Sequence, residues 1–308
     1  MYHRFEENKY PSTNIKIADF KSHINIIKNS DFEFISYKQF IKHVNKKNNT
    51  KKIFLTIDDG FSSFYRNAWP ILKKEKIPFV IFVNTESVGS PGYMSWEELK
   101  EISEFDFAHI GNHSHSHGYL ADKSDDEIRK DIKTSMKIFE KNLNHKTEFF
   151  AYPFGEYKNS YKKIVKDLGF NYGLGQHSGV IDSTKDRFEL PRFPINEKYG
   201  ELKRFKSLIN YFPLEYKSLE PDEKKIDKNN NPPNLIVEFF NEQQNINNIN
   251  CYSNDGGNWK KSKLIFEKNK LIINFEDQFL PRRGRINCSL NDNGKWRWFG
   301  TQFVVKKN

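Results

Sequence analysis

Hydrophobic and polar positions form alternating blocks along the first two thirds of the chain, and the blocks switch between helix and strand spacing. Residues 17–29 place Phe20, Ile24 and Ile27 three or four positions apart, which predicts an amphipathic helix. A continuous apolar run at 53–57 has the length of a buried strand. Further strands are predicted at 79–83, 107–110 and 149–152. Helical segments separate these strands, so the order predicts an α/β fold, which we interpret as an irregular (β/α) barrel.

Two of the predicted helices carry recognisable start signals. Ser95 can cap a short helix that begins at Trp96. Ser124 is followed three residues later by Glu127, the pattern of a capping box. The helix after Ser124 presents an apolar face made of Ile128, Ile132, Met136 and Phe139.

The pattern changes after about residue 215. Residues 221–233 are charged, rich in asparagine and end in two prolines, which indicates a linker. Beyond them the predicted strands are short and the turns are rich in Gly, Asn and Asp. We therefore predict an α/β domain at 1–215, a linker at 216–233 and a small all-β, sandwich-like domain at 234–308.

One internal repeat lies in this last region. Residues 249–259 and 286–296 share an Ile-Asn-Cys start, an Asn-Asp pair and a closing Trp. Each copy predicts a strand, a tight turn and a second strand. Cys251 and Cys288 occupy the same position in the two copies, so they could lie on facing strands. Both a single structural disulfide and two buried free thiols fit this pattern.

Composition adds limits on the class of protein. The chain has 308 residues, of which 36% are hydrophobic and 15% aromatic, so it can bury a real core. Its net charge of +10 is spread along the whole chain, which we interpret as surface solvation. No RNA- or DNA-binding signature accompanies the charge, so we predict no nucleic-acid partner. No apolar run approaches the roughly 20 residues that cross a bilayer.

Two adjacent carboxylates end the first buried run. Asp58 and Asp59 follow residues 53–57 directly and precede Gly60. Carboxylates at the exit of an apolar strand are costly unless something uses them. One can ligate a metal while its neighbour accepts a proton. An ordinary Asp-Gly turn is the alternative interpretation.

A histidine cluster follows the run at 107–110. His113, His115 and His117 lie within five residues, in a chain with nine histidines. His113 and His117, four positions apart, can point to one side of a helical turn and offer two nitrogen ligands, which suits zinc. His115 would point elsewhere. A solvent-exposed polar loop is the alternative.

These clusters and a third one resemble the polysaccharide deacetylases of carbohydrate esterase family 4, which share the NodB homology domain. The family motif Thr-Phe-Asp-Asp-Gly is matched by Thr56-Ile57-Asp58-Asp59-Gly60, and His-Ser/Thr-x-x-His by His113-Ser114 with His117. The third motif, Arg-x-Pro-Tyr/Phe-Gly, is met by residues 151–155 except that Ala151 replaces the arginine. The resemblance covers about residues 1–210, which implies that the domain at 1–215 is catalytic.

Two departures from the family pattern point to a particular branch. The usual late motif with its histidine is missing after the third motif, and a Tyr2-His3 pair opens the chain instead. This resembles the circularly permuted branch that includes exported poly-N-acetylglucosamine deacetylases, which implies His3 as general acid. Arg192 is a candidate to orient Asp58, and a surface arginine beside a strand is the alternative.

The resemblance implies hydrolysis of N-acetyl groups on an amino-sugar polysaccharide. It implies one divalent ion, zinc first and cobalt or nickel as alternatives, on Asp59, His113 and His117, with Asp58 as base. It assigns the third motif to substrate binding, through Tyr152, Pro153, Phe154 and Gly155. We also expect a periplasmic, cell-surface or secreted location, with an export signal and part of a first strand lying outside this chain.

Two other interpretations stay open. Another metal-dependent amidohydrolase or phosphoesterase would use His113 and His115 as a His-x-His pair. A secreted carbohydrate-binding protein without activity is the second alternative. Under each of these interpretations, the C-terminal domain offers aromatic side chains that could bind sugar. They are Trp259, Trp296 and Trp298.

Overall fold

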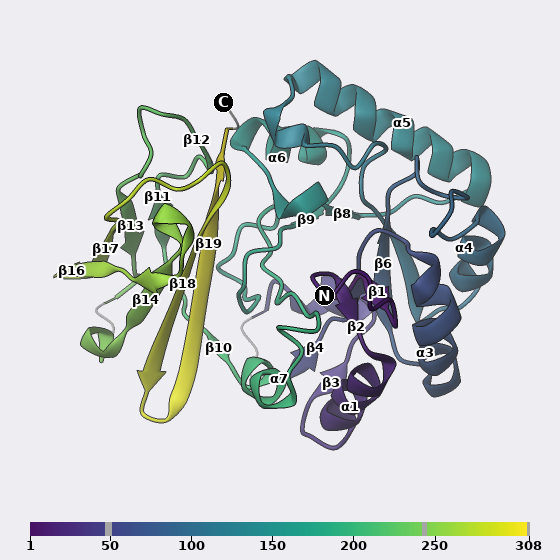
Figure 1. The fold of residues 1–308 in the computed structure, drawn as a ribbon, viewed down its shortest axis with the longest axis horizontal. Coiled ribbons are helices and arrows are strands. Elements are labelled where there is room, and N and C mark those ends of the chain that lie inside the picture. Colours follow the sequence, from purple (N-terminus) through teal and green to yellow (C-terminus); the bar gives the residue numbers. More distant parts are fainter. Residues whose placement is uncertain (47–50, 242–244, 307–308) are drawn as a thin grey trace.

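A curled, five-stranded parallel sheet forms the centre of the first part of the molecule (Figure 1). The computed structural model describes residues 1–46, 51–241 and 245–306. The strand order follows the sequence, which confirms the predicted α/β fold with a barrel-like sheet. The strands are β5 (Thr56–Ile57), β6 (Phe79–Val83), β7 (Ala108–Asn112), β8 (Phe149–Ala151) and β9 (Tyr172–Leu174).

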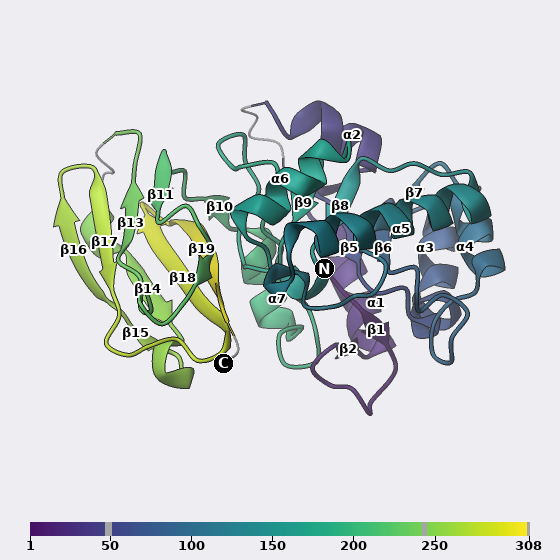
Figure 2. The ribbon, with the colours of Figure 1, turned by 90° about the horizontal axis from the view of Figure 1, so that it is seen from above.

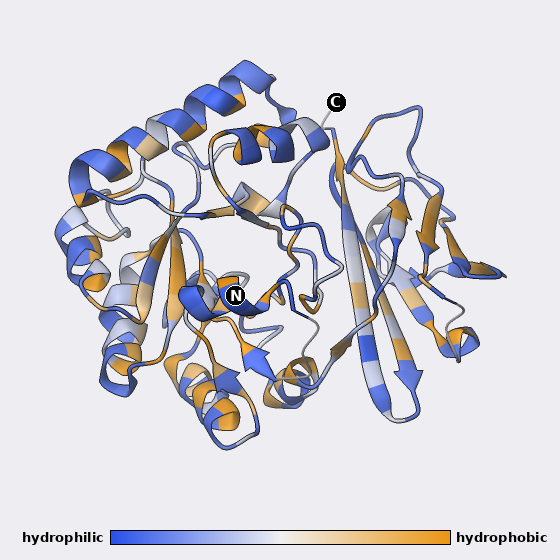
Figure 3. Ribbon diagram, turned by 180° about the vertical axis from the view of Figure 1, so that it is seen from behind, coloured by the Kyte–Doolittle hydropathy of each residue, from blue (hydrophilic) through white to orange (hydrophobic). Residues whose placement is uncertain are grey.

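Helices cover the outside of this sheet (Figures 1 and 3). Their hydrophobic residues face the strands, and capping boxes at Ser95 and Ser124 confirm the two predicted helix starts. None of the helices in the described ranges is long and apolar enough to span a membrane. The helices are α1 (Ile17–Lys28), α2 (Tyr37–His43), α3 (Trp69–Glu75), α4 (Trp96–Ser103), α5 (Asp125–Leu143), α6 (Asn159–Asp167) and α7 (Leu202–Ile209), with a π-helix at Phe64–Ala68.

The apolar run at 53–57, expected as one strand, is divided between two sheets. β4 (Lys52–Ile53) pairs with β3 (Glu33–Phe34), whereas β5 pairs with β6. Phe54, between β4 and β5, stacks on Phe40 of α2 with ring centroids 4.3 Å apart. This packing places a helix contact inside the run, so the run forms two short strands instead of one.

Two antiparallel-rich sheets form the C-terminal part and enclose a second core (Figure 2). One has the order β10-β19-β18-β14-β15 with β12 beside β19, and the other the order β11-β13-β17-β16. The first contains β10 (Phe212–Pro213), β12 (Lys225–Ile226), β14 (Asn250–Ser253), β15 (Lys260–Lys261), β18 (Arg282–Asp292) and β19 (Lys295–Val305). The second contains β11 (Ser218–Glu220), β13 (Leu235–Glu238), β16 (Lys263–Glu267) and β17 (Lys270–Asn274).

The range expected as a linker, 216–233, is not free of secondary structure. β11 pairs with β13 in one sheet, and β12 pairs with β19 in the other. Part of this range therefore extends the C-terminal sheets instead of only bridging two domains. The domain boundaries themselves stay a prediction.

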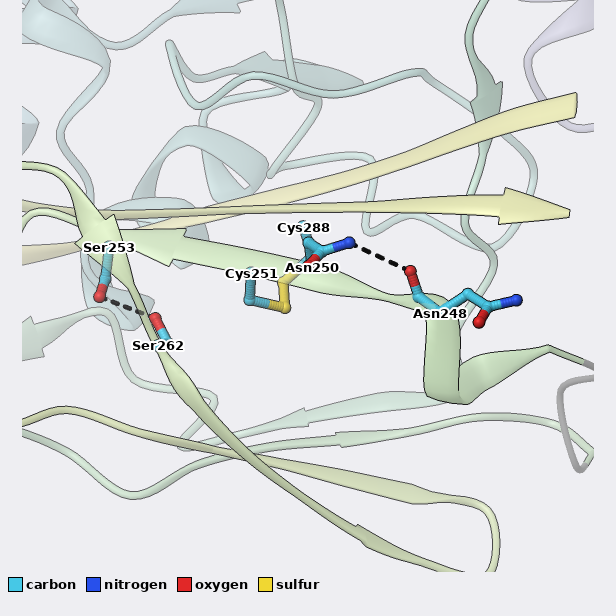
Figure 4. Close-up of a disulfide and its surroundings, with 6 residues drawn as sticks. All are labelled: Asn248, Asn250, Cys251, Ser253, Ser262 and Cys288. Carbon is cyan, nitrogen blue, oxygen red and sulfur yellow. Dashed lines mark hydrogen bonds between the residues drawn. A yellow bond between two sulfur atoms is a disulfide. The ribbon is translucent and has the colours of Figure 1, made fainter. Parts of the chain in front are cut away.

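The two copies of the repeat are neighbours in one sheet. Cys251 on β14 lies directly opposite Cys288 on β18, and a disulfide joins them (Figure 4). Of the two options for the cysteines, the structure therefore has the disulfide. β18 and β19 are joined by a two-residue turn, as the repeat predicts. The loop from β14 to β15 is longer than the predicted tight turn, because a 3-10 turn at Asp255–Gly257 lies within it.

Candidate metal centre and active site

Three side chains with metal-ligand chemistry meet at the carboxyl edge of the parallel sheet. Asp59 follows β5, His113 follows β7, and His117 comes four residues later. His113 Nε2 lies 3.3 Å from Asp59 Oδ1, and His117 Nε2 lies 3.1 Å from the same oxygen. The structure thus brings together the three residues that the sequence predicts as ligands.

The proton on His113 is placed by a backbone carbonyl. His113 Nδ1 lies 2.7 Å from Ala151 O, and a carbonyl oxygen can only accept, so Nδ1 carries the proton. In the neutral ring, Nε2 then presents its lone pair to Asp59 Oδ1. Within the described residues, neither atom has a hydrogen-bond partner. Two acceptors held face to face are what a cation between them would stabilise, so these residues fit a divalent metal.

The backbone at this site adopts conformations that most residues avoid. Asp59, Ser114 and His117 have φ values of 75°, 69° and 51°, in the left-handed region. Such conformations cost energy for residues other than glycine and cluster at functional sites. Burial would raise the pKa of Asp59, but the nearby imidazoles of His117 and His3, where they carry positive charge, hold this pKa well below its usual value.

The histidine loop is anchored by a residue that the sequence patterns did not indicate. Asp131 of α5 accepts the N–H of His115 at 2.8 Å and that of Ser116 at 3.1 Å. Helical spacing marks Asp131 only as a polar position, so no local signal reveals this contact. His115 points away from the ligand set, as predicted, with Nδ1 2.9 Å from Thr85 Oγ1. The His113–His115 pair of the amidohydrolase alternative therefore does not converge on one point.

Asp58 is buried beside the predicted ligands and forms a bidentate pair with Arg192. Arg192 Nη1 donates to Asp58 Oδ1 at 2.6 Å, and Nη2 donates to Oδ2 at 2.8 Å. Arg192 is itself fixed by its Nε, which donates to Gly175 O at 2.8 Å. Burial would raise the pKa of Asp58, but the guanidinium of Arg192, together with His113 and His3, outweighs burial and lowers this pKa. Arg192 is therefore not a surface arginine.

His3 lies next to this carboxylate pair at the start of the chain. Tyr2 forms an isolated parallel bridge with Ile57 of β5, and the N–H of Asp58 donates to Tyr2 O at 2.9 Å. Because Tyr2 pairs with Ile57, the next residue, His3, lies beside Asp58 and Asp59, which follow Ile57. Burial lowers the pKa of His3, while Asp59 and Asp58 act in the opposite direction.

Of the four residues of the third motif, only Phe154 keeps an accessible side chain. Tyr152 is fully buried in the core, so our assignment of its side chain to substrate binding is wrong. Pro153 and Gly155 are buried as well. Gly155 has φ 71°, and an added Cβ would lie 2.5 Å from the backbone nitrogen of Gln176, so only glycine fits there. Phe154 keeps part of its surface exposed, and its ring centroid lies 4.6 Å from that of His117.

Comparison with known proteins finds similarity in the first part of the chain. The model of the polysaccharide deacetylase family matches residues 45–173. The poly-beta-1,6-N-acetyl-D-glucosamine N-deacetylase of Staphylococcus aureus is 28% identical over 194 residues, covering 58% of this chain and 67% of the relative. The protein of that name from Staphylococcus epidermidis is 29% identical over 192 residues, covering 58% and 66%.

Solved structures share the fold of this part. The Streptococcus pyogenes deacetylase PplD, in complex with acetate, has a TM-score of 0.62 at 23% identity and covers 68% of this chain and 96% of its own. IcaB from Ammonifex degensii has a TM-score of 0.61 at 24% identity, with 68% and 94% covered. Both alignments leave about a third of the present chain unmatched.

Proposed function

Because this chain carries a domain of the polysaccharide deacetylase family, we propose that it removes N-acetyl groups from an amino-sugar polysaccharide in a metal-dependent hydrolysis. The observation that carries the proposal is the facing pair of acceptors, Asp59 Oδ1 and His113 Nε2, with His117 beside them. The staphylococcal relatives are named for a polymer of N-acetyl-D-glucosamine. A polymer of N-acetylglucosamine is therefore the substrate class that we propose.

Asp59, His113 and His117 would hold the metal. One carboxylate and two imidazoles suit zinc, and cobalt or nickel could take the same ligands. When bound, such an ion lowers the pKa of water towards about 7 and polarises an acyl oxygen. The hydrogen bond from His113 Nδ1 to Ala151 O keeps Nε2 directed at the metal position.

Asp58 acts as general base in this proposal. Its carboxylate accepts a proton from the attacking water, and its burial next to the predicted ligands supports this role. The two-point contact with Arg192 fixes the plane of the carboxylate and keeps it ionised.

His3 protonates the leaving amine. An imidazole is suited to this step because its ordinary pKa lies near neutrality. Burial lowers the pKa of His3, and the carboxylates of Asp59 and Asp58 oppose that shift. A backbone N–H near Phe154 is the proposed partner for the oxyanion that forms on the acetyl group.

We also propose that the protein works outside the cytosol, on a cell surface, in a periplasm or as a secreted protein. The supporting observation is the Cys251–Cys288 disulfide, since such bonds persist in oxidising compartments.

Metal content and deacetylation of an N-acetylglucosamine pentamer test this function in the wild type and two variants. We expect one metal per wild-type chain and release of acetate, with both lost in His113→Ala. His115→Ala is the matched control, because His115 lies in the same loop and contacts Thr85 instead. A metal-free wild type would contradict the proposal, and two metals per chain would favour another amidohydrolase reaction.

A second variant separates metal binding from proton transfer. Asp58→Asn keeps the shape of the side chain but removes the base, so turnover should fall by about 10²–10⁴-fold while metal content stays at one per chain. Substantial remaining activity would show that Asp58 is not the base.

A further inference from the structure

The C-terminal sheet reaches the candidate active site through β18 and β19. Arg283 Nη1 donates to Phe154 O at 2.9 Å, and Gln302 Nε2 donates to Gly155 O. Arg282 Nη2 donates to Glu156 Oε1 at 2.8 Å. Three consecutive loop residues thus receive donors from residues 126 to 147 positions later in the chain.

These contacts place Arg282 in a row of rings that begins at the metal centre. The ring centroid of Phe154 lies 4.6 Å from that of His117 and 4.6 Å from that of Tyr119. The Arg282 guanidinium lies 3.4 Å from the centroid of Tyr119 and 4.7 Å from that of Phe154. The row therefore connects a predicted metal ligand to the C-terminal sheet.

Tyr119 keeps a large accessible surface although Arg282 covers part of its ring. The residue is 50% exposed, and the side chain of Arg282 is 26% exposed. Stacking with a guanidinium holds an aromatic ring in place, which lowers the entropy that binding would cost. Ligand sites commonly combine such a fixed aromatic surface with a few polar groups that set orientation.

Hydrogen-bond donors exceed acceptors around this row. Glu156 is the carboxylate that Arg282 and Arg283 contact, and Arg285 of the same strand adds a third guanidinium nearby. Arg282 Nη1 and Arg285 Nε have no acceptor within the described residues. An excess of donors suits a ligand rich in oxygen atoms, as a sugar is.

We propose that Tyr119 and Arg282 form a subsite for the sugar unit next to the one that is deacetylated. The apolar face of that sugar contacts the exposed surface of Tyr119, and its oxygens accept hydrogen bonds from Arg282. The C-terminal sheet is then part of the substrate site. This inference rests on the proposed deacetylase function and extends it to recognition of more than one sugar.

Substrate length tests the subsite. kcat/KM is measured for wild type, Tyr119→Ala and Arg282→Ala on an N-acetylglucosamine pentamer and on 4-nitrophenyl acetate, a small ester without a second sugar. We expect kcat/KM for the pentamer to fall about tenfold, chiefly through KM, and kcat/KM for the ester to stay within about twofold. Arg297→Ala is the matched control, because Arg297 lies on the same hairpin and pairs with Asp292.

Each other outcome has a distinct meaning. An equal fall in kcat/KM on both substrates in Arg282→Ala would show that Arg282 acts only by holding residues 154–156. An unchanged kcat/KM for the pentamer in Tyr119→Ala would contradict the proposed subsite. Pentamer binding, measured by calorimetry on the same proteins, is independent of turnover. If the wild type binds pentamer but releases no acetate, the deacetylase proposal fails, and weaker binding by Tyr119→Ala still supports the subsite.

Discussion

Asp255 in the C-terminal sheets is buried and Asp59 at the edge of the parallel sheet keeps 14% of its side chain exposed, and the two carboxylates have different partners. Asp255 accepts from Ser253 Oγ at 2.6 Å and from the N–H groups of Glu276 and Asp277 at 3.1 and 3.0 Å. Lys260 Nζ lies 3.0 Å away. Asp59 Oδ1 instead faces the ring nitrogens of two histidines and has no hydrogen-bond partner in the described ranges.

The difference separates a structural carboxylate from a functional one. A carboxylate surrounded by donors stabilises the fold in which it sits. A carboxylate held against acceptors costs stability unless a ligand of positive charge joins them. A lowered pKa is common to both residues, so the hydrogen-bond partners of each carboxylate are what distinguish them.

Asparagine in place of Asp59, and separately in place of Asp255, tests this comparison, and the larger effect is expected at Asp59. Asp59→Asn should lose metal and lower kcat at least about 10³-fold, because a ligand of the reaction centre is removed. The metal-free form should unfold at the same denaturant concentration as metal-free wild type or at a higher one, since an amide can donate to a histidine nitrogen. Metal analysis, acetate release and urea unfolding check the three parts. A marked loss of stability would mean that Asp59 is a structural residue.

The disulfide offers the largest expected effect within the C-terminal sheets. Replacing Cys251 and Cys288 together by serine removes a cross-link between residues 37 apart. The entropy of the opened loop should lower the free energy of unfolding by about 3–4 kcal/mol. Denaturant unfolding with and without the pair measures this. Acetate release under folding conditions should be unchanged, because the cysteines lie in the C-terminal core and not at the metal centre.

Asp255→Asn is the counterpart of Asp59→Asn. The amide places donors against backbone N–H groups, so the free energy of unfolding should fall by about 2–3 kcal/mol. Metal content should stay at the wild-type level, and both quantities come from the same protein preparations. A neutral effect on stability would break the contrast between the two aspartates.

The smallest expected effect is a loss of stability in acid that comes from the first part of the chain. All nine histidines precede residue 215. Burial lowers the pKa of His109 on β7 to about 3, whereas an unfolded chain binds this proton near pH 6.5. Between these values the unfolded state holds more protons, so stability falls as pH falls, by about 1.4 kcal/mol per pH unit. His109→Gln should remove this contribution, and urea unfolding at pH 7, 6 and 5 compares the slopes. Equal slopes would contradict it.

Several parts of the site were predictable because their signals are local. Asp58 and Asp59 stand directly after an apolar run, His113 directly follows β7, and His117 comes four residues later. Parallel strands bring their carboxyl ends to one edge of the sheet. The capping boxes at Ser95 and Ser124 are likewise local. Tyr152 was misassigned because a strand-end tyrosine has the same sequence signal whether its ring faces the core or the cleft.

Contacts between distant segments had no such signal. Asp131 holds the histidine loop from a helix, and Arg282 approaches Glu156 from 126 residues away. No spacing rule connects such pairs, because the first forms only when α5 packs against the parallel sheet and the second only when the C-terminal sheet packs against the barrel. The split of the run at 53–57 has the same origin, since the packing of Phe54 on Phe40 decides it.

The sequence by itself therefore determined the order of strands and helices, the ligand-type residues at the strand ends and the matched positions of the two cysteines. Helix and strand periodicity and short motifs depend on neighbours within a few residues, so they can be recognised in the chain alone. The tertiary structure decided that the cysteines are joined, that Arg192 pairs with Asp58 and that the C-terminal sheet borders the active site. Each of these depends on which surfaces pack together, and packing joins residues that sequence spacing leaves independent.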